Sequence, residues 1–120
     1  MSALSTRDRA RAFRGSVNFL LLGVSGLILP LASVRRRVFV TGRVQGVWFR
    51  ESCREQALAS SVTGWVRNRS DGRVEAVFEG SPAAVERVVA WCHDGPRHAS
   101  VDRVESHEEP PIGESGFHVR

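Results

Sequence analysis

The chain has 120 residues, of which 42% are hydrophobic and 25% are charged, a composition typical of one globular domain and not of a disordered or fibrous chain. Its formal net charge of +4 rests on 17 arginines, with no lysine. Residues 1–34 hold four arginines against one aspartate, whereas residues 35–120 hold 13 arginines against 12 acidic residues. Because the second segment is nearly neutral, the high isoelectric point is no evidence for nucleic-acid binding.

An uncharged run of 20 residues, from Gly15 to Val34, follows the basic N-terminal segment. Three interpretations stay open. Basic residues before an apolar run are typical of a signal peptide, although Leu31 stands where a small residue is expected before the cleavage site. As a membrane anchor the run is barely long enough. The third interpretation is a wrongly assigned start with translation from Val34, because an arginine-rich chain without lysine suggests GC-rich coding, in which GTG starts are common.

We therefore divide the chain into an N-terminal extension, residues 1–34, and a domain, residues 35–120. The expected location is the cytoplasm, with anchoring or export through the extension as the alternative. Contact with a membrane is expected only if residues 15–34 are retained as an anchor. We expect a monomer without a nucleic-acid partner.

The first half of the domain predicts a strand over residues 37–41, which are mostly β-branched or aromatic, and a glycine-bearing turn over residues 42–47. Residues 48–60 contain neither glycine nor proline and predict a helix. Four residues fall on the face of this helix that is expected to be covered: Phe49, Cys53, Gln56 and Ala57.

A hairpin follows, because the pair Asp71-Gly72 separates strand patterns over residues 62–68 and 73–79. Apolar and charged residues alternate in the second of these strands, so we expect one face of it to be covered and the other to lie in water. The charged positions are Arg73, Glu75 and Glu79.

Ser81 and Pro82 predict the start of a second helix, as N-cap and first helical residue. Gly95-Pro96 ends it, and residues 101–106 and 117–119 predict the last strands. The order β-α-β-β-α-β is that of the split βαβ, ferredoxin-like fold, an α+β sandwich in which both helices cover one face of a four-stranded antiparallel sheet. The fold by itself assigns no function.

The cysteines and histidines show no pattern of a metal site. Cys53 and Cys92 are too few for a disulfide scaffold and lack the partner cysteines of a zinc ribbon. They fall near helix ends that approach each other in this fold, so a bridge is conceivable, but a reducing compartment favours free thiols. The four histidines lack close pairing. We expect neither a metal nor a cofactor.

The most informative segment runs from Gly42 to Arg50, where a glycine-bearing turn joins a strand to a helix. Such a turn leaves backbone N–H groups unpaired at the positive end of the helix, and this concavity suits a phosphate-sized anion. Arg50, in the first helical turn, can bind two oxygens of the same anion. The spacing fits neither a P-loop nor a dinucleotide-binding fingerprint. The alternative is a tight turn whose glycines only permit positive φ.

A second segment places Asn68 at the end of a strand, before a Ser-Asp-Gly turn. Its side-chain amide can accept a hydrogen bond from a water and donate one to a phosphoryl oxygen. The alternative is turn chemistry, because an asparagine before such a turn often bonds its own backbone.

Together the two segments resemble the acylphosphatase family. The run Gly-x-Val-Gln-Gly-Val-x-Phe-Arg extends from Gly42 to Arg50, and the run Gly-Trp-Val-x-Asn-x-x-Asp-Gly-x-Val-Glu from Gly64 to Glu75. The resemblance covers essentially the whole domain and implies the same split βαβ fold. It implies catalytic roles for Arg50 and Asn68. It also implies a phosphate-binding loop, which consists of Gln45, Gly46, Val47, Trp48, Phe49 and Arg50.

The family resemblance implies hydrolysis of a small-molecule acyl phosphate to a carboxylate and inorganic phosphate. The leaving carboxylate is a weak base, so the reaction needs mainly neutralisation of charge around the phosphoryl oxygens and an aligned water. The loop backbone and Arg50 would supply the first and Asn68 the second. One departure is that Arg69 and Arg73 are bulkier and more charged than this hairpin usually carries.

Two functions of other classes stay open. One is a non-catalytic or carbamoyl-phosphate-handling module, like the similar domain of hydrogenase-maturation carbamoyltransferases. Those proteins carry long zinc-finger and further domains downstream. The other is an RNA-binding ferredoxin-like module, which is disfavoured because the exposed aromatic pattern of that class is missing.

Overall fold

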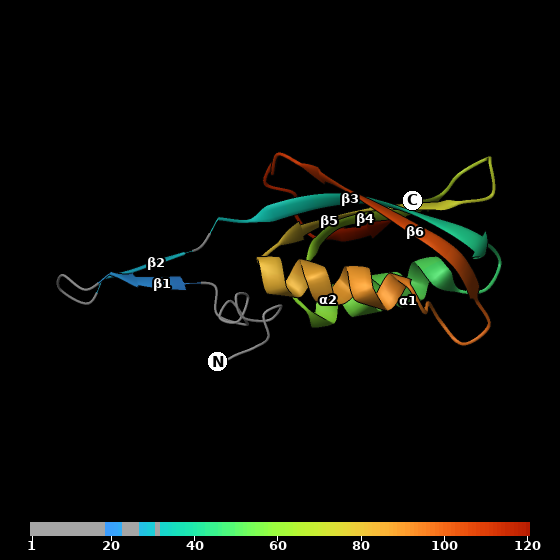
Figure 1. The fold of residues 1–120 in the computed structure, drawn as a ribbon, viewed down its shortest axis with the longest axis horizontal. Coiled ribbons are helices and arrows are strands. Elements are labelled where there is room, and N and C mark those ends of the chain that lie inside the picture. The colour runs from blue at the N-terminus through green and yellow to red at the C-terminus, as the bar shows by residue number, and fades with distance from the viewer. Residues whose placement is uncertain (1–18, 23–26, 31) are drawn as a thin grey trace.

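The computed structural model describes residues 19–22, 27–30 and 32–120. Within these ranges it forms strands and two helices, arranged as in Figure 1. In chain order the elements are β1 (Phe19–Leu22), β2 (Leu27–Pro30), β3 (Val34–Arg43), α1 (Phe49–Ala59), β4 (Thr63–Asn68), β5 (Val74–Gly80), α2 (Pro82–Cys92), β6 (Ser100–Glu109) and β7 (Phe117–Val119).

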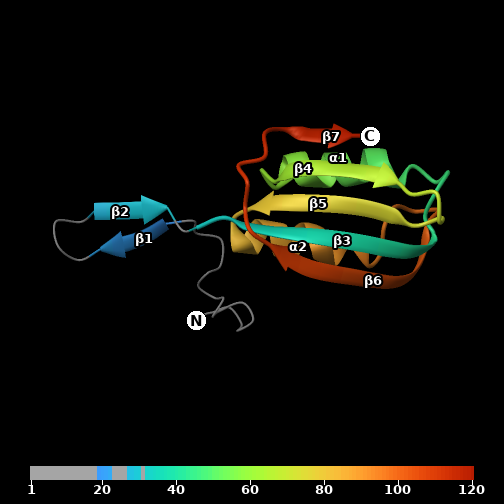
Figure 2. The same ribbon diagram turned by 90° about the horizontal axis from the view of Figure 1, so that it is seen from above.

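The main sheet has five strands in the order β6-β3-β5-β4-β7, and both helices lie on one of its faces (Figure 1, Figure 2). Neighbouring strands are antiparallel except β4 and β7, which run parallel. The ferredoxin-like α+β arrangement is therefore confirmed, but the sheet is not purely antiparallel and has a fifth strand. β7 is added because Gly64 N–H donates to Gly116 O at 2.9 Å and Arg120 N–H donates to Val66 O at 2.8 Å.

The core lies between the sheet and the helices. Alternate residues of β3 and β5 meet the apolar faces of α1 and α2, as the spacing predicts. The buried residues of these four elements include Val38, Val40, Val74, Ala76, Phe78, Phe49, Cys53, Ala57, Val85, Val88 and Cys92. Gln56, expected on the covered face of α1, is exposed because it lies at the edge of the buried stripe. Ser81 caps α2, with its Oγ accepting from Ala84 N–H at 3.3 Å.

Cys53 and Cys92 are free thiols, fully buried and in contact between the two helices. Burial raises the pKa of the Cys53 thiol well above its ordinary value, and the contact with Cys92 raises it further. A protonated, buried thiol is a poor nucleophile, so Cys53 acts as part of the core. Cys92 is equally buried and packs there with it.

The sheet face opposite the helices is covered by ion pairs. The expectation that Glu75 and Glu79 lie in water is wrong, since only 3% and 5% of these residues is exposed. Glu75 accepts hydrogen bonds from Arg37, Arg67 and Arg69. The long arginine side chains lie over the sheet and exclude water from the carboxylates. The alternation of residues along one strand cannot show this cover, because the cover comes from other segments of the chain.

Within the N-terminal extension the structure describes residues 19–22, 27–30 and 32–34. β1 and β2 pair with each other and not with the main sheet, whereas Val34 already belongs to β3. The other predictions for residues 1–34 fall largely on residues 1–18, 23–26 and 31, which lie outside the described residues. Across the described ranges, no helix has both the length and the apolar character needed to cross a membrane.

Glu79 anchors the loop that leads to β7. Its carboxylate accepts hydrogen bonds from Gly113 N–H at 2.7 Å, from Ile112 N–H at 3.2 Å and from Arg35 Nη1 at 3.0 Å. Burial alone would raise the pKa of Glu79, but these hydrogen bonds outweigh burial and hold the pKa below its ordinary value. Glu79 is therefore a charged, buried residue of β5 that holds the backbone of this loop.

We expect Glu79→Gln to lower the free energy of unfolding at neutral pH by about 3 kcal/mol, because it leaves a buried arginine without one partner. The folded pKa of Glu79 lies below the unfolded value of about 4.3, so its stabilising effect is present above that value and is lost as the pH falls through the folded pKa. The variant should therefore lose less stability than wild type on acidification, as measured by urea denaturation between about pH 3 and 7.

The matched control is Glu108→Gln, which changes an exposed glutamate of β6 and should shift the free energy of unfolding by no more than about 0.5 kcal/mol. A Glu79→Gln protein as stable as wild type at neutral pH would show that this carboxylate does not anchor the loop.

Candidate active site

The turn between β3 and α1 has a backbone shape that exposes its N–H groups. Val44 and Val47 are buried, whereas Gly46 and Trp48 have positive φ angles of 74° and 68°. These left-handed residues bend the chain sharply while the valines anchor it in the core. α1 begins at Phe49, and no side chain in the described part of the chain caps its first turn. The turn therefore presents unpaired donors and the positive end of the helix dipole.

Gln45 fastens this turn to the hairpin between β4 and β5. Its side-chain amide donates to Arg69 O at 2.8 Å and to Arg73 O at 3.0 Å. Both amide hydrogens are thus used within the protein, so the Gln45 side chain positions the turn. The two bonds bring the end of β4, with Asn68, beside the start of α1, with Arg50.

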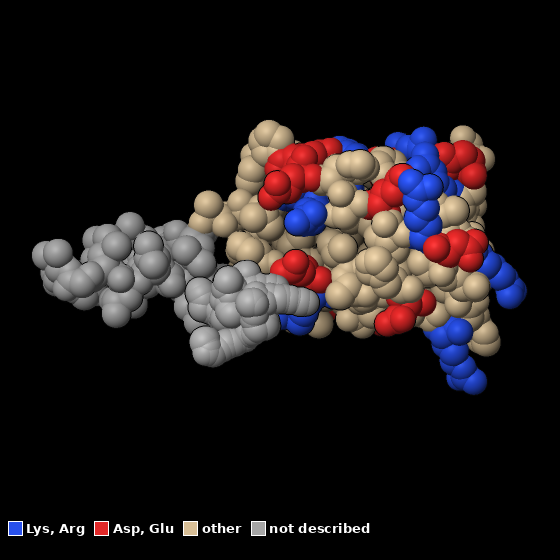
Figure 3. All heavy atoms as spheres, viewed as in Figure 1, with Lys and Arg blue, Asp and Glu red and all other residues tan. Residues whose placement is uncertain are grey.

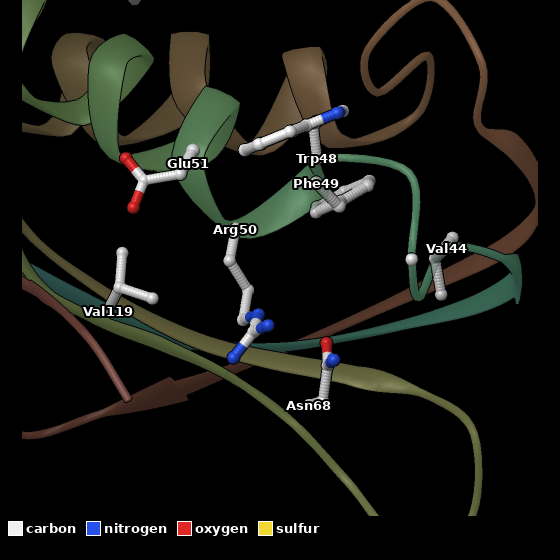
Figure 4. A pocket seen from close by; sticks show the side chains of 8 residues that line it. Val44, Trp48, Phe49, Arg50, Glu51, Asn68 and Val119 are labelled. Carbon is white, nitrogen blue, oxygen red and sulfur yellow. The ribbon is translucent and has the colours of Figure 1, made fainter.

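A pocket of about 450 Å³ lies between the turn, the start of α1 and the end of β4 (Figure 4). The Arg50 side chain extends from α1 toward the strands, and its guanidinium shares this space with the amide of Asn68. The pocket is lined by Val44, Gly46, Trp48, Phe49, Arg50, Glu51, Asn68 and Val119.

Arg50 is oriented by the main chain beyond β7. Its Nη1 donates to Arg120 O at 3.0 Å, and Arg120 N–H is itself bonded to Val66 O on β4. A guanidinium carries five N–H donors, so this bond leaves others for a ligand. The parallel pairing of β7 with β4 therefore sets the direction of the Arg50 side chain.

Asn68 has a side-chain oxygen without a protein partner. Its Oδ1 is buried and has no hydrogen-bond partner in the described part of the chain. Buried oxygens of this kind are uncommon, and they mark places where a water or ligand binds. The hairpin turn is closed instead by Asp71, whose Oδ1 accepts from Arg73 N–H at 3.1 Å. The alternative that the Asn68 side-chain oxygen bonds the backbone of the turn is therefore not supported.

The structure brings most of the predicted site residues together. Those that line the pocket are Gly46, Trp48, Phe49, Arg50 and Asn68. Gln45 and Val47 do not line it, because one side chain points to the hairpin and the other into the core. The sequence analysis missed Val44, Glu51 and Val119. Glu51 could have been predicted from the sequence as a pocket residue, because it lies in the first turn of the helix.

Metal ligands do not gather at this site or elsewhere in residues 32–120. No group of three or more histidine, cysteine, aspartate or glutamate side chains that could hold a metal ion occurs among the described residues. The charged groups of the pocket are Arg50 and Glu51.

Comparison with known proteins identifies the family of the domain. The acylphosphatase family model matches residues 36–119. The acylphosphatase of Rubrobacter xylanophilus is 61% identical over 87 residues, which cover 72% of this chain and 79% of that protein. The acylphosphatase of Chloroflexus aurantiacus is 57% identical over 84 residues, covering 70% of this chain and 91% of that protein.

Solved structures show the same fold. An acylphosphatase from Coxiella burnetii superposes with a TM-score of 0.72 at 39% identity, covering 74% of this chain and 94% of the other. A full-length HypF structure superposes with a TM-score of 0.69 at 24% identity, covering 73% of this chain and 12% of the other, which shows a shared fold alone. Since the family model spans the five-stranded domain and both site motifs, this chain belongs to the acylphosphatase family.

Proposed function

We propose that this pocket hydrolyses acyl phosphates to a carboxylate and inorganic phosphate. The observation that supports this best is the convergence of Arg50, Asn68 and the uncapped start of α1 on one pocket. Relatives named acylphosphatase at 57% and 61% identity support the same reaction.

The reaction proceeds by direct attack of water on phosphorus. A bond forms between the water oxygen and phosphorus, and the bond between phosphorus and the acyl oxygen breaks. Its electron pair leaves with the carboxylate, while both protons of the water stay on the phosphate until it exchanges with solvent. Because a carboxylate is a weak base, the leaving group needs no general acid, and positioning and charge neutralisation carry the reaction.

Arg50 and the loop from Gln45 to Arg50 hold the phosphoryl group. The unpaired N–H groups at the start of α1 and the free guanidinium donors bind its oxygens and stabilise the charge that shifts during the reaction. Asn68 acts on the water, since its unpartnered Oδ1 accepts a hydrogen bond and so aligns the attacking oxygen. Gln45 contributes through its backbone and by fixing the turn.

We assign this activity to residues 35–120, acting as a monomer in the cytoplasm. A small acyl phosphate is the substrate, and phosphate is the product. Figure 3 shows arginine and acidic side chains interspersed on the visible face, without one continuous basic surface. Together with the near balance of 13 arginines and 12 acidic residues over residues 35–120, the distribution on this face supports a domain without a nucleic-acid partner.

We expect Arg50→Ala to lower kcat/KM for benzoyl phosphate by about a thousandfold and to raise KM, because Arg50 holds the phosphoryl group in both ground and transition states. Asn68→Ala should lower kcat by about a hundredfold with little change in KM, because it acts on the water. Steady-state kinetics on variants with unchanged circular dichroism measures both.

The matched control is Arg87→Ala, which removes an exposed arginine of α2 and should keep wild-type kinetics. Wild-type turnover in Asn68→Ala would refute its assigned role, and wild-type kcat/KM in Arg50→Ala would refute the proposed site.

Inorganic phosphate should stabilise the protein without any metal, because it presents the same oxygens to the same donors. At about 100 times its Kd a ligand stabilises the folded state by about 2.7 kcal/mol. In a small domain each kcal/mol raises Tm by roughly 4–8 °C, so saturating phosphate with EDTA should raise Tm by about 10 °C or more. Calorimetry with chloride at equal ionic strength is the reference. An equal shift in Arg50→Ala would place the anion elsewhere.

Residues 1–33 should be dispensable. β3 begins at Val34, and β1 and β2 pair only with each other among the strands described. A protein shortened to begin at Val34 should keep its specific activity, and its Tm should stay within about 4–8 °C of the full chain, a change of roughly 1 kcal/mol. A much larger drop in Tm would mean that the extension packs on the domain.

A further inference from the structure

Trp48 combines three features that together indicate a ligand. The residue is 74% exposed, its φ of 68° is one that bulky residues rarely adopt, and it lines the pocket. The other tryptophans are packed. Trp65 is 7% exposed beneath arginine guanidinium groups, and Trp91 lies against Phe49 with ring centroids 5.2 Å apart. The indole of Trp48 is therefore apolar surface left open at the site.

Exposure alone would carry no function, because single apolar residues are common on protein surfaces. Leu58 and Ile112 are 49% and 68% exposed, but neither lines the pocket. Gly46 adopts a similar left-handed backbone without steric conflict. A tryptophan at such a position retains the steric strain of the left-handed backbone, and its ring gains little stabilisation from burial. The ring therefore does not serve the stability of the fold, and its place at the pocket indicates a role in binding.

Trp48 and the two polar groups of the pocket lie on different sides of it. The guanidinium of Arg50 and the amide of Asn68 lie on the strand side, and Trp48 lies on the helix side (Figure 4). Val44 and Val119 add apolar lining. With the phosphoryl group held by the turn and Arg50, an aromatic acyl group can lie against the indole, an arrangement that aromatic pairs favour in offset or edge-to-face geometry.

We propose that Trp48 is the specificity-determining residue for the acyl group and that it favours aromatic acyl phosphates over short aliphatic ones. This inference rests on the proposed function. The phosphoryl group is common to all substrates, so contacts with the acyl group alone discriminate between them. Without the ring, the helix side of the pocket would lack the exposed aromatic surface that distinguishes a benzoyl from an acetyl group.

The test compares kcat/KM for benzoyl phosphate with kcat/KM for acetyl phosphate in the full chain. Asparagine tolerates a left-handed backbone, so Trp48→Asn removes the ring while keeping the turn. The ratio of the two values cancels any loss common to both substrates. It should fall about tenfold in Trp48→Asn and by less than about threefold in Trp48→Phe, which keeps a ring. Leu58→Ala, an exposed residue of α1, is the control and should keep the wild-type ratio.

Binding of two stable phosphonates separates this inference from the proposed function. Phenylphosphonate and methylphosphonate lack the bond that is hydrolysed, so their dissociation constants, measured by calorimetry, report the ring contact without turnover. The preference for phenylphosphonate should fall about tenfold in Trp48→Asn. Ratios within about twofold of wild type in both assays would overturn the role of Trp48. No hydrolysis of either acyl phosphate by wild type would overturn the proposed function and, with it, the acyl role of Trp48.

Discussion

The conformation of the turn between β3 and α1 is the constraint on which the site depends. Left-handed backbone at Gly46 and Trp48 bends the chain beside the pocket while Val44 and Val47 remain buried, and the N–H groups of the turn are left for a ligand. Such a conformation costs a non-glycine residue roughly 1–3 kcal/mol and persists only where surrounding contacts enforce it. A change in the length of this turn would alter the backbone that presents these N–H groups, whereas Arg50 would keep its place on α1, because Phe49, Cys53 and Ala57 fix the buried face of that helix.

Contacts from distant parts of the chain hold both sides of this site. The Gln45 amide ties the turn to the hairpin that carries Asn68, and the main chain after β7 orients Arg50. β7 in turn follows the loop that is bonded to the buried carboxylate of Glu79. The ion pairs on the outer face of the sheet therefore stabilise the geometry of a pocket on the helix-covered side, without touching it.

Local patterns were enough to predict the helices and strands of residues 35–120 and the fold class, but not β1 and β2, and they singled out the two segments that line the pocket. Alternation, the Ser-Pro helix start and the Asp-Gly turn each act within a few residues. The parallel pairing of β7 could not be predicted, because a strand of three residues carries no pattern that names its partner. The burial of Glu75 was missed because its cover comes from arginines on β3 and β4 and in the β4–β5 turn, which only the sheet order brings together. The unpartnered oxygen of Asn68 is likewise a property of the assembled fold.

The proposed mechanism requires that water attack phosphorus and not the carbonyl carbon of the acyl group. Only then do the phosphate-binding turn and the alignment of water by Asn68 act on the same reacting atom. Hydrolysis of benzoyl phosphate by the full chain in water enriched in heavy oxygen tests this most directly. Mass spectrometry of the products should find the heavy oxygen in the phosphate and none in the benzoate. Heavy oxygen in the benzoate would mean that the carbonyl carbon is attacked, which would contradict a phosphoryl group held between Arg50 and the start of α1.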